Sequence, residues 1–72
     1  MERLVYQIVC LSPGWLVTLG GRPAGQMFAR QADAIRTAKG QAAAAYPAKL
    51  IIRDEAGDIV EEILFDGPTH NS

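Results

Sequence analysis

The feature that most constrains this chain is a change in the spacing of its apolar residues. The stretches 4–19 and 48–66 are rich in Val, Ile, Leu and aromatic residues, as strands are, whereas apolar residues recur every three or four positions between about residues 30 and 46. Period two is typical of strands and period 3.6 of a helix. The sequence therefore predicts one helix, beginning at residue 29 or 30 and ending at 46, between two pairs of strands.

Turn residues divide the two strand-forming stretches. Strands are expected over residues 4–11, 15–19, 48–53 and 59–66. Ser12-Pro13-Gly14 and the loop around Gly57 carry the residues that tight turns prefer. The run GGRPAG at 20–25 is interpreted as a loop, with 26–28 as a short extension of strand. We therefore expect an α+β domain, in which one helix packs on one face of a four-stranded, mainly antiparallel sheet (β-β-α-β-β).

The predicted helix has a narrow apolar face. Its stripe is mostly alanine and comprises Ala32, Ile35, Ala38, Ala42 and Ala45 or Tyr46. Arg30 stands where a capping Ser, Thr or Asp would be expected, and Pro47 ends the helix. The expected core of the whole domain is Trp15, Val17, Phe28, Ile35, Ala38, Ala42, Leu50, Ile52 and Ile63.

The length and the scarcity of cysteine and histidine restrict what stabilises this fold. Seventy-two residues make one domain, expected over residues 1–66, followed by a flexible tail at 67–72. Cys10 is the only cysteine and His70 the only histidine. No intrachain disulfide or zinc site follows from them, and no metal or cofactor is expected. The apolar stretch 4–21 is interrupted by Pro-Gly and polar residues, so a membrane segment is not expected, and the lone thiol favours a cytoplasmic protein.

Catalytic patterns are not apparent, and we expect that the chain is not an enzyme. Cys10 falls within a strand and His70 in the tail, so a nucleophile and its base are not paired. Glu61 and Glu62 are adjacent on a strand and point to opposite faces, which excludes a carboxylate pair. The loop 54–58 lacks the length of a calcium-binding loop, and 20–25 lacks the ending of a phosphate-binding loop.

Short motifs along most of the chain, from Gly14 to Pro68, resemble a known family. They are Gly14-Trp15-x-Val17, Phe28 before a helix with Ala34-Ile35-x-x-Ala38, Pro47-Ala48-x-Leu50-Ile51-Ile52, and Gly57-x-Ile59-x-x-Glu62. This pattern is similar to the small bacterial family called domain of unknown function 2188. The resemblance implies a strand–strand–helix–strand–strand domain and brings no established activity. Members of that family usually carry Thr, Ser or Asp near position 30, and Arg30 departs from that pattern.

The first functional hypothesis is a protein-interaction module that forms a homodimer or docks on another protein. One helix covers only one sheet face, yet several strands are apolar on both faces, and exposed apolar patches mark interfaces. The candidate interface residues are Val5, Val9, Leu11, Val60 and Leu64. All Lys and Arg lie at or before Arg53, whereas residues 54–72 hold six acids and no base, so opposite charges of two copies could orient them.

Nucleic-acid binding is the second hypothesis. Arg22, Arg30, Arg36 and Lys39 could cluster around the glycine-rich loop and the helix. Trp15, Tyr6 or Phe65 could stack on bases if they were exposed. The net charge of −1 argues against this hypothesis, because small nucleic-acid-binding domains are usually basic.

Overall fold

The computed structural model describes residues 3–67. In chain order its elements are β1 (Leu4–Leu11), β2 (Gly14–Leu19), β3 (Arg22–Phe28), α1 (Gln31–Ala44), β4 (Ala48–Arg53) and β5 (Ile59–Phe65). The predicted α+β class and the strands at 4–11 and 48–53 are confirmed, and the helix is two residues shorter at its C-terminal end than expected. It begins after Arg30, whose extended backbone occupies the N-cap position without a side-chain capping hydrogen bond.

The sheet has five strands, so the prediction of four strands is wrong. The additional strand is β3, which takes up most of the segment that was expected to be a loop at 20–25. Only Gly20 and Gly21 form the turn, both with positive φ, and Leu19 pairs with Arg22 directly across it. A two-residue Gly-Gly connection is a strong hairpin signal, because such turns need positive φ at both central residues. Pro23 and Gly25, which disfavour strands, obscured this signal.

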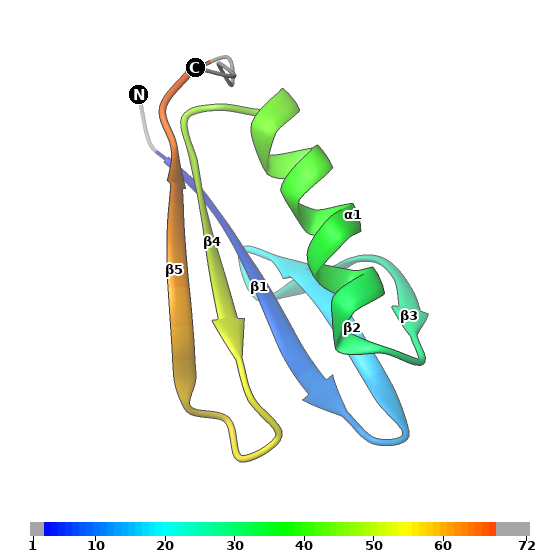
Figure 1. The fold of residues 1–72 in the computed structure, drawn as a ribbon. Coiled ribbons are helices and arrows are strands. Elements are labelled where there is room, and N and C mark those ends of the chain that lie inside the picture. The colour runs from blue at the N-terminus through cyan, green and yellow to red at the C-terminus, as the bar shows by residue number, and fades with distance from the viewer. Residues whose placement is uncertain (1–2, 68–72) are drawn as a thin grey trace.

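The sheet is mixed, with three antiparallel neighbouring pairs and one parallel pair, so it is mainly but not purely antiparallel. Its strand order is β3-β2-β1-β4-β5, with β1 and β4 parallel and every other neighbouring pair antiparallel. Figure 1 shows the reason: α1 carries the chain back across one face of the sheet, so that β4 enters from the same end as β1. A helical crossover of this kind is the usual connection to a parallel neighbour.

Three alanines one helical turn apart place α1 close to the sheet. Ala34, Ala38 and Ala42 are fully buried, whereas Ala32 and Tyr46 are exposed and Ile35 and Ala45 are half-buried. Ala38 and Ala42 of the predicted stripe are thus buried, whereas Ala34, which the prediction left out, is buried in place of Ala32. The short side chains of Ala34, Ala38 and Ala42 let the helix axis approach the strands closely.

The core lies between α1 and the central strands. Its fully or nearly fully buried members are Tyr6, Ile8, Val17, Ala34, Ala38, Ala42, Ala48, Leu50 and Ile52. Of the expected core, Trp15, Phe28, Ile35 and Ile63 pack against this cluster but are only partly buried. For Ile63 the reason is its position on β5, because α1 packs across β1 to β4 and leaves β5 largely uncovered at the sheet edge (Figure 1). Among residues 3–67, no helix has the length and apolarity needed to span a bilayer.

Candidate functional site

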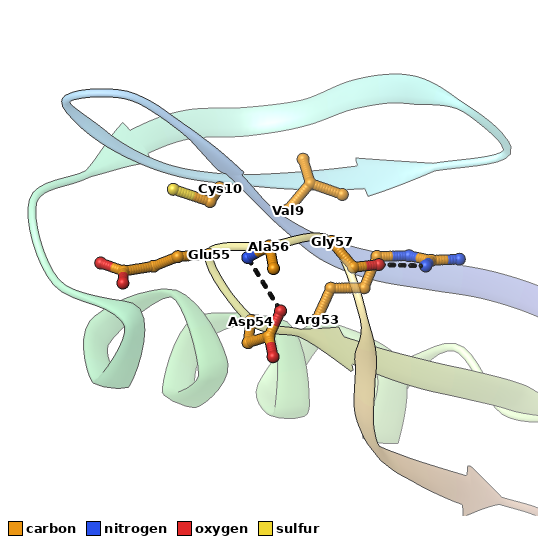
Figure 2. Close-up of a pocket in the computed structure, with 7 residues that line it drawn as sticks. All are labelled: Val9, Cys10, Arg53, Asp54, Glu55, Ala56 and Gly57. Carbon is orange, nitrogen blue, oxygen red and sulfur yellow. Dashed lines mark hydrogen bonds between the residues drawn. The ribbon is translucent and has the colours of Figure 1, made fainter.

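A shallow pocket lies where the parallel strands β1 and β4 end. It has a volume of about 290 Å³, and its lining residues are Val9, Cys10, Arg53, Asp54, Glu55, Ala56 and Gly57 (Figure 2). The chain leaves β1 toward β2 and leaves β4 toward β5, so the two hairpins diverge and open a crevice between them. Crevices at the carboxyl ends of parallel strands are frequent ligand sites in α/β proteins, which makes this pocket the first place to look for chemistry.

The polar groups of this pocket hold the β4–β5 loop in place. Arg53 donates from Nε to the side-chain oxygen of Gln7 at 2.9 Å and from one terminal nitrogen to the carbonyl of Gly57 at 2.8 Å. The carboxylate of Asp54 accepts from the backbone N–H groups of Ala56 and Asp58, at 2.9 and 3.0 Å (the former is drawn in Figure 2). The side chains of Arg53 and Asp54 thus form hydrogen bonds within the protein, and these bonds account for the conformation of the β4–β5 loop.

Two further reactive groups line the pocket, the half-buried thiol of Cys10 and the carboxylate of Glu55. His70, the only histidine, lies outside the described residues. Within residues 3–67, no three His, Cys, Asp or Glu side chains gather where they could hold a metal ion. Among its described lining residues, the pocket therefore combines one thiol with two carboxylates and a guanidinium, and it includes no imidazole.

The five residues predicted as an interface do not form one apolar patch. On the sheet face opposite α1, Val5 of β1 and Leu64 of β5 lie in one row, with Lys49 of β4 between them. The next rows place Ile51 and then Arg53 between these two strands, so β4 divides the residues of β1 from those of β5. Val9 is half-buried beside Leu16, and Leu11 is exposed at the end of β1.

Three of the exposed large apolar residues lie on β5, more than on any other strand. Ile59, Val60 and Leu64 expose 47%, 58% and 57% of their surface. Two of the acids of this strand and its flank form salt bridges inside the chain, Glu62 with Lys49 and Asp66 with Arg3. The acidic segment is thus partly neutralised by the fold, and an uncovered apolar strand edge remains.

The four basic residues of the nucleic-acid hypothesis do not gather at one place. Arg22 is the first residue of β3, and Arg30 follows its last residue by two positions, so they flank opposite ends of that strand. Arg36 forms a salt bridge with Asp33 on α1, and Lys39 is exposed on the same helix. The candidate stacking rings are on the side of the core, since Tyr6 is buried and Trp15 and Phe65 pack against the buried cluster.

Comparison with known proteins identifies a family for this chain, and no individual relative. Neither the curated proteins nor the solved structures compared with the chain include a match. The sequence pattern of one family, described as "Uncharacterized protein conserved in bacteria (DUF2188)", matches residues 6–65, which span β1 to β5. With this match over most of its length, the chain belongs to the DUF2188 family of bacterial proteins.

Proposed function

We propose that this protein is a non-enzymatic interaction module that associates with a second copy of itself through the edge of β5. The observation that carries the proposal is the exposure of Ile59, Val60 and Leu64 on a strand with an unpaired edge. Strand edges and exposed apolar side chains are the two features by which sheets add further strands.

The two edges of the sheet differ in how well they could accept a strand. β3 contains Pro23, which has no N–H group, and its pairing with β2 is irregular between Leu16 and Thr18. β5 pairs regularly with β4 from Ala48 to Ile52 and departs from that register only at its first residues. Because both edge strands have a register shift, the difference between them is Pro23, and a Pro is a common protection of an edge strand, so β5 is the more available edge.

The non-enzymatic part of the proposal is supported by the pocket at the ends of β1 and β4. Its arginine and its aspartate are engaged in hydrogen bonds that shape the loop between β4 and β5. This network gives Arg53 and Asp54 a structural role that does not require a substrate.

The test is the molar mass in solution by light scattering or sedimentation, from about 10 µM to 1 mM. This range is needed because an interface formed by one strand edge is small and its affinity correspondingly weak. We expect the mass to rise toward a dimer, and Leu64→Lys to return it to that of a monomer. Leu11→Lys is the matched control, because Leu11 is similarly exposed but lies on β1.

The outcomes separate the possible surfaces. If Leu11→Lys disrupts the dimer and Leu64→Lys does not, the contact uses the sheet face near β1, and the assignment to β5 is wrong. If the mass stays that of a monomer over the whole range, self-association itself is refuted.

Nucleic-acid binding through Arg22, Arg30, Arg36 and Lys39 is the competing proposal, and the positions of these residues support it less well. It predicts that DNA or RNA binds at low salt, that affinity falls steeply as salt increases, and that replacing all four residues by Ala abolishes binding. Binding of either nucleic acid by the monomer would favour this alternative over the interaction module.

A further inference from the structure

The edge of β5 can be described residue by residue, because the direction of its backbone groups follows from the pairing of β4. Leu4 donates its N–H to the carbonyl of Pro47 at 3.1 Å, so the backbone of residue 47 faces β1. Successive residues of a strand face alternate sides, and Ala48, Leu50 and Ile52 therefore face β5.

The same alternation applies to β5. Phe65, Ile63 and Glu61 are the partners of Ala48, Leu50 and Ile52, so their N–H and C=O groups face β4. The backbone groups of Glu62 and Leu64 consequently point away from the sheet, whereas the alternation does not extend to Val60, because the register with β4 shifts between Ile52 and Arg53. The groups of Glu62 and Leu64 are those that an added strand would contact.

We propose that two copies pair β5 with β5 in antiparallel orientation around a two-fold axis at Glu62, and that Lys49 makes this pairing possible. This inference rests on the proposed self-association and names its register. β5 spans Ile59–Phe65, so Glu62 is its central residue, and an axis there lies at the midpoint of the strand. It sets Val60 opposite Leu64 of the second copy, and each covers an apolar side chain that is otherwise more than half exposed.

The central position of this register brings two glutamates face to face. Like charges directly opposite each other on paired strands are destabilising. In each copy, however, Nζ of Lys49 lies 3.1 Å from a carboxylate oxygen of Glu62, and the two side chains are 33% and 44% exposed. The centre of the pair would then hold two lysines and two glutamates, a neutral cluster.

Lys49 therefore matters more to the dimer than to the folded monomer. A partly exposed salt bridge contributes little to the stability of a single chain. Across the two-fold axis it offsets the repulsion of the two glutamates, and it does so twice because each copy supplies one lysine. Lys49 acts on the partner through Glu62, as a residue that determines specificity.

Charge-neutralising substitutions test this register. Lys49→Gln should weaken dimerisation by about tenfold, which corresponds to a loss of about 1.4 kcal/mol at 25 °C, whereas Lys39→Gln, the same change on the exposed face of α1, should leave it unchanged. Glu62→Gln should strengthen dimerisation, whereas Glu55→Gln in the exposed β4–β5 loop should not. The double variant Lys49→Gln/Glu62→Gln should dimerise at least as well as the wild type, because the repulsion is then absent.

A nitroxide label reports the register directly. With Cys10 replaced by Ser, labels attached at position 62 should lie closer to each other across the dimer than labels at position 59, and spin–spin coupling measures both. Circular dichroism of each variant establishes that it is folded.

The outcomes distinguish this inference from the proposal on which it rests. A dimer that is dissociated by Leu64→Lys, but is insensitive to Lys49→Gln and Glu62→Gln, retains the β5 edge and refutes the register. A wild type and a Glu62→Gln variant that both remain monomeric refute self-association altogether.

Discussion

Gly14 lies at the point where β2 starts beside the end of β3. It is buried, and a Cβ atom built on it would lie 2.6 Å from the carbonyl oxygen of Phe28. Real Cβ atoms do not approach a backbone oxygen so closely, and backbone cannot move aside as a flexible side chain can. A hydrogen in place of a methyl group is therefore what allows the two strands to pack here.

Replacing Gly14 by Ala should lower the free energy of unfolding by about 1–3 kcal/mol, the usual cost of forcing extra volume into a packed site. Chemical denaturation monitored by circular dichroism measures it. Gly25→Ala is the matched control, because Gly25 lies on β3 with no atom within 4 Å of the added Cβ. Equal losses in the two variants would show that strand propensity, and not the contact with Phe28, decides the effect.

At the scale of the element, α1 depends on small residues at its contact with the sheet. Ala34, Ala38 and Ala42 are fully buried, whereas Ala44 at the end of the helix is exposed. The strands under them supply the larger side chains, Ile8, Leu50 and Val17. The small side chains of the helix thus allow a short distance between helix and sheet, and the side chains of the strands supply most of the volume of the core.

Enlarging the buried face of α1 should separate it from the sheet. Ala38→Leu should reduce the free energy of unfolding by about 1–3 kcal/mol, since the added methylene groups have no space at a fully buried position. Ala44→Leu, the same change at an exposed position of the helix, should change stability by less than about 0.5 kcal/mol. Thermal unfolding followed at 222 nm compares the two variants, and a neutral Ala38→Leu would contradict the close contact described here.

At the scale of the whole molecule, the two ends of the sheet are unequal. One edge strand, β3, is crossed by α1 and contains Pro23, whereas β5 lies beyond the helix and exposes most of its side chains. The helix thus covers the sheet on the side of β3 and leaves the edge at β5 open (Figure 1). Hydrogen exchange can report this asymmetry, because an amide without a hydrogen-bond partner exchanges quickly.

The amides of Glu62 and Leu64 should exchange rapidly at low protein concentration and become protected as the concentration rises. The amide of Ile8, in the central strand, should be protected at every concentration. NMR-detected exchange at two concentrations measures both. Protection that develops on β3 instead, or nowhere on β5, would contradict the assignment of the open edge.

Local patterns in the sequence were enough to predict the class, the single helix and four of the five strands. Pro47 ends the helix, and β-branched runs form β1 and β4, because these effects act over a few neighbouring residues. The turn at Gly20-Gly21 was also within reach of local reasoning, but the Pro and Gly residues after it led to the prediction of a loop. The family resemblance was read from short motifs and is confirmed over residues 6–65.

Burial and pairing were decided only by the tertiary structure. Apolar residues on both faces of β1 and β5 looked equivalent in the sequence, yet α1 covers the central strands and does not reach across β5. β1 and β4 became parallel neighbours because the helix returns the chain to the same end of the sheet, and that same pairing placed Lys49 beside Glu62. Such contacts join residues far apart along the chain, so no local pattern specifies them. The sequence determined which elements form, and the packing of one helix on four of the five strands decided which edge stays open.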